Sequence, residues 1–139
     1  MSKILKIRAR QVFDSRGNPT VEAEVYSKNL SASAICPSGA STGTYEAFEK
    51  RDNNNKKYLG KSVLGAVNLV NTKISKKLIG KNIHDQTRID TILINLDGTR
   101  QKTSLGANAI LAVSMAAKKL SAKIKNIPLY KTFLVKNNY

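Results

Sequence analysis

The sequence has few of the residues that most enzymes and metal proteins use for chemistry. Of its 139 residues only one is cysteine and one is histidine, and tryptophan is absent. The single cysteine, Cys36, cannot form an internal disulfide, which fits a reducing compartment. The single histidine, His84, excludes a metal site with several histidines and gives His-based triads no support. We interpret His84 as a polar residue just before a helix, and Cys36 as a small core residue.

Long hydrophobic runs are also missing. No apolar run approaches the roughly 18 residues that a membrane helix needs. The amino terminus, MSKILKIRAR, mixes charges into its apolar positions and lacks the apolar region and cleavage site of a signal peptide. We therefore expect a cytoplasmic protein without a membrane partner.

Acidic residues are scarce: nine Asp and Glu stand against 24 Lys and Arg, for a net charge of +15. Such an excess can mark a nucleic-acid binder. However, the lysines are scattered from Lys3 to Lys136, and the few Phe and Tyr residues offer no obvious stacking platform. We expect a solvated basic surface, or one facing an acidic partner, rather than a nucleic-acid site. A basic standalone binding module stays open as an alternative, and steep salt-dependent retention on DNA would favour it.

Alternating apolar residues in the first third predict two strands, one at 5–13 and one over 21–25, joined by a turn at 14–19. A third strand is expected at about 31–37. The predicted inward-facing residues are Leu5, Ile7, Ala9 and Phe13 in the first strand, and Val21, Ala23 and Val25 in the second. If these strands pair antiparallel, two arginines share a face with two glutamates: Arg8, Arg10, Glu22 and Glu24.

The rest of the chain has helical periodicity. The first helical stripe consists of Val63, Val67, Val70, Ile74 and Leu78, and it ends at Gly80. Asp85 is the expected N-cap of a second helix that ends at Gly98. An alanine-rich helix, 105–124, is expected to be buried, and a short last helix covers 128–134. Strands followed by helices indicate an α+β fold: a three-stranded antiparallel meander followed by about four α-helices.

The long loop from Cys36 to Lys61 is unusual for a small domain, and such loops are commonly functional or mobile. It contains PSGASTG, whose small residues cannot fill a core. The motif is not a P-loop, because no Gly-Lys-Ser/Thr follows it. Three acidic residues after it could bind a metal, but such residues more often lie in solvent or at a helix start: Glu46, Glu49 and Asp52. The loop therefore offers oxygen and amide groups, which suit Mg²⁺ or an anionic substrate.

Seven motifs occur in a characteristic order and spacing. They are DSRGNPT (14–20), PSGASTG.YEA (37–47), RD (51–52), LGK (59–61), LDGT (96–99), LGANAILAVS (105–114) and PLY (128–130). Together they resemble the amino-terminal domain of the enolase family, over essentially the whole chain (1–139). The sequence departs from the family pattern at NNNKK (53–57) and at Gln101, Thr103 and Ser104, which affects only details of loop packing.

The resemblance implies a glycolytic lyase that dehydrates 2-phospho-D-glycerate to phosphoenolpyruvate with Mg²⁺. In this family the domain packs beside an α/β barrel, which carries the acid, the base and the tight metal site, so no catalytic residue is expected here. The amino-terminal domain supplies a mobile lid over the substrate. By this resemblance the substrate loop consists of Ser38, Gly39, Ala40, Ser41, Thr42 and Gly43.

Within that loop the resemblance assigns Ser41 as a ligand of the second Mg²⁺. Gly39 and Gly43 would give the loop the freedom of a hinge. Arg16 matches a subunit-contact position. The resemblance also implies a homodimer for the full-length family, and it leaves cell-surface or secreted display open. The chain stops at Tyr139, where the barrel should begin, and we expect no turnover without that barrel. A second alternative is an interaction domain that binds a barrel-bearing partner in trans.

Overall fold

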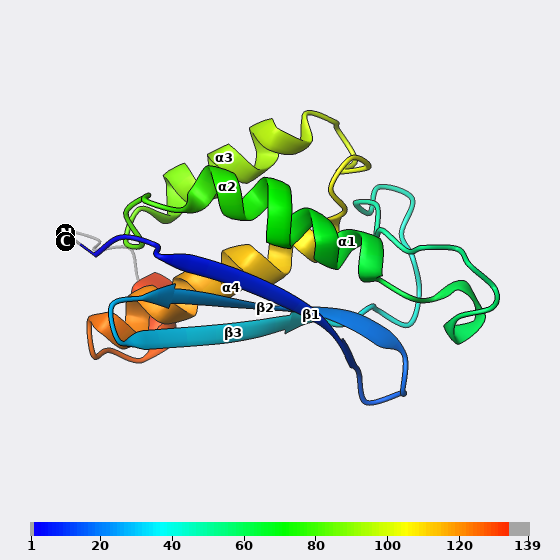
Figure 1. Ribbon diagram of the computed structural model, residues 1–139, viewed down its shortest axis with the longest axis horizontal. Coiled ribbons are helices and arrows are strands. Elements are labelled where there is room, and N and C mark those ends of the chain that lie inside the picture. The colour runs from blue at the N-terminus through cyan, green and yellow to red at the C-terminus, as the bar shows by residue number, and fades with distance from the viewer. Residues whose placement is uncertain (1, 134–139) are drawn as a thin grey trace.

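The computed structural model describes residues 2–133. Three strands form an antiparallel meander in the order β1-β2-β3, with β1 at Lys6–Phe13, β2 at Pro19–Ser27 and β3 at Leu30–Cys36. The helices follow the strands along the chain and cover one face of the sheet (Figure 1). This arrangement confirms the predicted α+β fold and its three-stranded meander.

The predicted charge pairing across the first two strands is present. Arg8 lies opposite Glu24, and Arg10 lies opposite Glu22. Arg10 contacts both glutamates, with its Nε 3.0 Å from Glu22 Oε2 and its Nη2 2.8 Å from Glu24 Oε2. Because these side chains are partly exposed, each pair contributes about 0.2–1 kcal/mol. The hydroxyl of Tyr26 also donates to Glu24 and is the main cause that lowers the pKa of this carboxyl.

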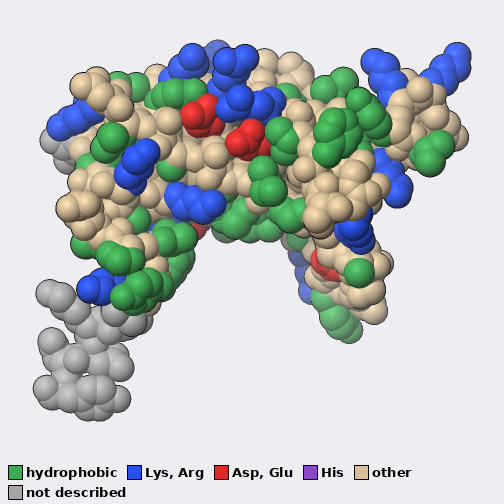
Figure 2. Space-filling view, turned by 90° about the horizontal axis from the view of Figure 1, so that it is seen from below, with side chains coloured by type: hydrophobic (Ala, Val, Ile, Leu, Met, Phe, Trp, Pro, Cys, Tyr) green, Lys and Arg blue, Asp and Glu red, His purple; other side chains and the backbone are tan. Residues whose placement is uncertain are grey.

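Basic side chains are dispersed over one face of the molecule (Figure 2). Figure 2 shows Lys and Arg side chains spread over the visible face, with few acidic side chains among them. A surface of this kind fits the expected solvated basic surface.

The inward-facing set of β1 differs from the prediction at both ends. Ile7 and Ala9 are buried, but Leu5 is 56% exposed and Phe13 is 51% exposed. The chain leaves the strand geometry before Lys6, because the backbone of Ile4 bonds to Gly80 and Lys81 instead. Ile4 therefore takes the buried position and Leu5 turns outward. Phe13, at the end of the strand, packs edge-to-face on Tyr58.

One continuous helical stretch contains the first predicted stripe. It consists of α1 at Leu64–Leu69, a π-helical turn η2 at Val70–Ile74, and α2 at Ser75–Leu78. All five predicted core positions are buried: Val63, Val67, Val70, Ile74 and Leu78. The π turn was not predicted. It contains Asn71, whose Oδ1 accepts from Ala9 N at 2.7 Å while its Nδ2 donates to Ala9 O at 3.1 Å. Asn71 thus pairs with the free edge of β1 as a neighbouring strand would.

The next two helices agree with the prediction. α3 at Gln86–Asp97 begins with the Asp85 side chain accepting from Arg88 N, and it ends at Gly98, which has φ +71°. α4 at Ala107–Ile124 packs against β2 and β3 with a buried alanine-rich face. Its buried alanines are Ala109, Ala112, Ala116, Ala117 and Ala122. Small side chains let the helix approach the sheet closely.

The last predicted helix, 128–134, is a short 3₁₀ helix rather than an α-helix. This element, η3, spans Leu129–Phe133, and Leu134 lies outside the described residues. A segment this short cannot build several α-helical turns. The described chain thus has three longer helical stretches instead of the expected four α-helices, together with a 3₁₀ turn, η1, at Tyr58–Gly60. Among residues 2–133, no helix has both the length and the apolar character needed to cross a bilayer.

Candidate functional site

The six predicted loop residues lie together in one exposed segment between β3 and α1. Ser38 is half-buried, and every residue from Gly39 to Phe48 is exposed. Between Pro37 and Lys57 the chain forms neither helix nor strand. Ser41 is therefore free to contact solvent or a ligand. We call residues 38–49 the Ser41 segment.

The chain before the Ser41 segment is held by the sheet. Cys36 pairs with Val21 in the β2-β3 ladder, and the Thr20 hydroxyl donates to the carbonyl of Cys36 at 2.6 Å. The register of β3 is therefore fixed up to its last residue.

The end of the Ser41 segment and the chain after it are held by the loop before α4 and by the start of α4. Phe48 N donates to Gln101 O at 2.7 Å, and Ala107 N donates to Phe48 O at 2.7 Å. The amide of Asn108 accepts from Lys50 N at 3.1 Å and donates to Lys50 O at 2.9 Å. These bonds require close approach of two backbones, which explains the glycine at position 106: a Cβ there would lie 2.5 Å from Lys50 Cβ. Gly106 also has φ +93°, a conformation that other residues rarely adopt.

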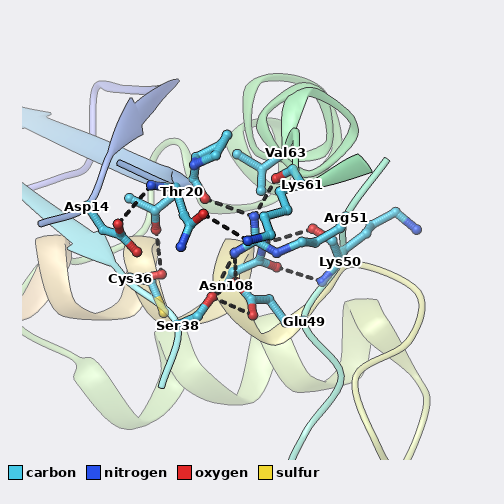
Figure 3. A network of polar contacts seen from close by, with 12 residues as sticks. Asp14, Thr20, Cys36, Ser38, Glu49, Lys50, Arg51, Lys61, Val63 and Asn108 are labelled. Carbon is cyan, nitrogen blue, oxygen red and sulfur yellow. Dashed lines mark hydrogen bonds and ion pairs between the residues drawn. The ribbon is translucent and has the colours of Figure 1, made fainter. Parts of the chain in front are cut away.

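Arg51 lies at the centre of the polar contacts beside the segment (Figure 3). Its Nη2 donates to Ser38 Oγ at 2.7 Å and to Glu49 Oε1 at 2.7 Å. Its Nη1 donates to the carbonyls of Pro19, at 2.9 Å, and Lys61. One guanidinium group therefore joins both ends of the Ser41 segment to the start of β2 and to the approach to α1.

Arg16 is the residue that the resemblance assigns to a subunit contact. In this single chain its Nη2 donates to the carbonyls of Ser38, at 2.9 Å, and Gly39, at 3.3 Å. The turn that carries it is closed by Asp14, whose side chain accepts from Asn18 N and Arg16 N, each at 2.9 Å. The bond from Asn18 is the main cause that lowers the pKa of Asp14. Arg16 therefore lies over the start of the Ser41 segment, and its contact between subunits stays a prediction.

The middle of the segment is tied mainly to itself. Glu46 N donates to Gly43 O at 3.2 Å, and Gly43 N donates to Glu46 Oε2 at 2.9 Å. Among the hydrogen bonds of residues 2–133, the stretch 39–47 is joined to the rest of the chain by the Arg16 bond to Gly39. The segment is thus anchored at its ends and free in its middle.

Comparison with known proteins agrees with this architecture. The family model for "Enolase, N-terminal domain" matches residues 4–133. The chain belongs to the family of enolase amino-terminal domains. A protein named enolase from Pelagibacter ubique (strain HTCC1062) is 94% identical over 139 residues, which is all of this chain and 33% of that protein. A second enolase, from Malacoplasma penetrans (strain HF-2), is 57% identical over 130 residues, which is 93% of this chain and 29% of that protein. The chain thus spans about a third of the length of these relatives.

In this enolase domain the three acidic residues near the loop have other roles than a shared metal site. Glu49 accepts from Ser38 and Arg51, and Glu46 closes the small turn at Gly43. Asp52 accepts from Leu64 N and Gly65 N, each at 2.9 Å, at the start of α1. No group of three or more His, Cys, Asp or Glu suited to a metal occurs in the part of the chain that the structure describes. The helix-start interpretation is confirmed for Asp52.

The Ser41 hydroxyl and the neighbouring carbonyls nevertheless fit a supporting role for Mg²⁺. They are exposed oxygen donors, and Mg²⁺ prefers oxygen ligands while keeping several waters. These donors suit an ion that keeps several waters, but they cannot enclose an ion by themselves.

Cys36 and His84 have structural roles. Cys36 is half-buried at the end of β3 and packs against the core, as expected. Burial, followed by the nearby Glu49 carboxylate, raises the pKa of its thiol. His84 Nδ1 lies 2.8 Å from Ser121 Oγ and joins the start of α3 to α4. Burial is the main cause that lowers the pKa of His84, so its neutral form is favoured.

The sequence prediction missed the residues that position the segment. Arg51 and Asn108 lie within the RD and LGANAILAVS motifs, and the sequence patterns predict no role for either residue. The available signal for Arg51 is its place beside Asp52 near the end of the long loop. Hydrophobic periodicity gives no information about such a loop residue. Asn108 is a fully buried polar residue in an alanine-rich helix, and such a residue needs a hydrogen-bonding partner.

Proposed function

We propose that this chain is the domain of an enolase that closes over 2-phospho-D-glycerate while the substrate loses water to form phosphoenolpyruvate. The single observation that carries the proposal is the Ser41 segment. The Ser41 segment consists mostly of small residues, is exposed in its middle and is anchored at both ends, and it lies in a chain of the enolase family. We further propose that Ser41 provides an oxygen ligand to Mg²⁺, and that acid and base come from the barrel.

The chemistry explains why such a segment is useful. A proton on the carbon beside a carboxylate is a poor acid, and its removal builds up negative charge on the substrate. When bound, Mg²⁺ supplies concentrated positive charge beside that carboxylate. Closure of a segment excludes water, which strengthens every electrostatic interaction in the site.

The side chains of the segment suit this closure. Ala40, Thr42 and the two glycines are small, so the backbone can approach a phosphorylated acid closely. Gly39 and Gly43 have the backbone freedom that lets the middle of the segment move. Ser41 lies between them and would be carried inward with its hydroxyl.

A chimera tests this function. The 139 residues replace the amino-terminal third of the Pelagibacter ubique relative, so that the chain is joined to that protein's remaining two thirds. We expect Mg²⁺-dependent formation of phosphoenolpyruvate, followed by ultraviolet absorbance, at a rate close to that of the intact relative. The 139-residue chain alone should show no turnover. A folded chimera that forms no product would contradict the proposal.

Three further expectations from the sequence are proposals too. They are the homodimer of the full-length protein, the subunit contact at Arg16, and the cytoplasmic location.

A further inference from the structure

Both ends of the Ser41 segment meet at one side chain. Ser38 and Glu49 lie eleven positions apart, and Arg51 Nη2 is 2.7 Å from an oxygen of each. Ser38 Oγ also lies 2.6 and 2.7 Å from the two Glu49 carboxylate oxygens. Ser38, Glu49 and Arg51 therefore form a closed triangle at the base of the segment.

The same guanidinium is itself held from the other side. Its Nη1 donates to the backbone carbonyls of Pro19 and Lys61, which belong to β2 and to the approach to α1. These carbonyls lie on parts of the chain that the sheet and the first helix fix. Arg51 thus holds the two ends of the segment in a fixed position relative to the sheet and the first helix.

Only arginine has the donor geometry for this arrangement. Its planar group offers five N–H donors in a rigid fork, whereas lysine offers a compact ammonium on a flexible stem. The four acceptors around Arg51 lie on two sides of the guanidinium, at Nη1 and at Nη2. A lysine could keep the positive charge but could not bridge all four acceptors.

We propose that Arg51 is a positioning residue for the Ser41 segment: it fixes the two ends between which residues 39–47 move. The kinetic part of this inference rests on the proposed function, whereas the structural part does not. Arg51 does not touch the substrate in this proposal. It acts by defining where Ser41 arrives when the segment closes.

Cys36 offers a direct readout of the base of the segment. A cavity of about 170 Å³ beside it is lined mainly by the base of the Ser41 segment and the start of α4, including Ser38, Gly39, Glu49 and Asn108. Opening of the base should therefore increase the exposure of this half-buried thiol to a reagent. In the chimera, peptide mass spectrometry separates modification of Cys36 from that of any other cysteine.

The first experiment compares thiol labelling in the chimera and in its Arg51→Met variant at one pH. We expect Cys36 to be labelled about tenfold faster or more in the variant. The closed state of the base loses its charge-assisted hydrogen bonds, so the open state is more populated. Loss of a positive charge would by itself raise the pKa of the thiol and slow labelling. An acceleration therefore reports opening.

Arg10→Met is the matched control, because Arg10 also makes charged contacts but lies on the solvent-facing side of the sheet. Its labelling rate should equal that of the parent chimera. Equal rates in all three proteins, or equal acceleration in both variants, would overturn the inference. Circular dichroism melting shows whether each variant is folded at the labelling temperature.

The second experiment measures turnover in Arg51→Ala and Arg51→Lys chimeras. Misplacement of Ser41 should lower kcat by roughly ten- to a hundredfold and raise the Mg²⁺ concentration for half activation, with a smaller change in KM. Added guanidinium ion should restore part of the loss in Arg51→Ala, while ammonium at equal ionic strength should not. A purely structural role predicts a lower melting temperature with unchanged Mg²⁺ dependence, and that result would overturn the inference.

The two experiments separate the inference from the function on which it rests. If the parent chimera shows no turnover, the proposed function fails, but Cys36 labelling still tests Arg51. If the parent turns over normally and Arg51→Met labels at the parental rate, the inference fails alone.

Discussion

Ser38 Oγ lies 2.6 and 2.7 Å from the two carboxylate oxygens of Glu49, across eleven positions of sequence. This contact closes the base of an otherwise exposed segment. It brings a carboxylate close enough to Cys36 to influence the thiol. The base of the segment can therefore be examined by titration as well as by mutation.

Replacing Glu49 by Gln should lower the pKa of Cys36. Burial is the larger cause of the raised pKa and the Glu49 carboxylate is the second, so the pKa should fall but stay above its ordinary value. The pH dependence of thiolate absorbance measures it. Glu46→Gln is the control, because Glu46 lines the same cavity without contributing to the shift, and should leave the pKa unchanged. An unchanged or higher pKa in Glu49→Gln would contradict the geometry.

Replacing Gly106 by Ala should destabilise the domain through the contact with Lys50. The added Cβ would lie 2.5 Å from Lys50 Cβ, at a residue with φ +93°. Gly80→Ala is the matched control, because Gly80 has φ +86° but nothing within 4 Å of the added atom. We expect Gly106→Ala to lower the free energy of unfolding by about 1–3 kcal/mol more than Gly80→Ala. Denaturant unfolding measures the difference, and equal losses would show that the close approach is absent.

Asp97 should make the stability of the domain depend on acid pH. This residue is 5% exposed, and its carboxylate accepts from Leu105 N, Thr99 N and the Thr99 hydroxyl. Burial opposes ionisation, but these hydrogen bonds outweigh it and lower the pKa below the ordinary value of 3.8. The unfolded chain then binds the proton more tightly. The stabilisation is present above pH 3.8 and is lost as the pH falls through the folded pKa.

Asp97→Asn measures that contribution. We expect a loss of about 1–3 kcal/mol in the free energy of unfolding at neutral pH, because buried N–H donors lose a charged acceptor. The difference between parent and variant should shrink as the pH falls below 3.8. A difference that grows in acid would reverse the assigned sign.

Much of the fold follows from short-range patterns. The alternation in β2, the five-residue stripe from Val63 to Leu78, and the capping residues Asp85 and Gly98 each report a local preference that the tertiary structure keeps. The Leu5 prediction was wrong because period-two alternation cannot detect where the chain leaves the strand to bond with residues 80 and 81. The π turn was missed because its Asn71 contacts Ala9, 62 positions away.

The candidate segment was found by its composition and by its family motif, but the residues that hold it were not. Arg51 joins Pro19, Ser38, Glu49 and Lys61, and no periodicity in one dimension indicates that these four positions meet. The contact of Arg16 with the carbonyls of Ser38 and Gly39 likewise depends on the turn that closes on Asp14. Long-range contacts of charged side chains are therefore what the sequence alone leaves undetermined here.

The most direct test is the Mg²⁺ dependence of turnover in the chimera and in its Ser41→Ala variant. Ser33→Ala is the control, because Ser33 is an exposed serine on β3, outside the Ser41 segment. Loss of the Ser41 oxygen should raise the Mg²⁺ concentration for half activation and lower kcat by roughly a hundredfold, the size seen when one group that stabilises developing charge is removed. The control should match the parent in both quantities. A Ser41→Ala variant with parental kcat and Mg²⁺ dependence would contradict the claim that this domain brings a metal ligand to the site.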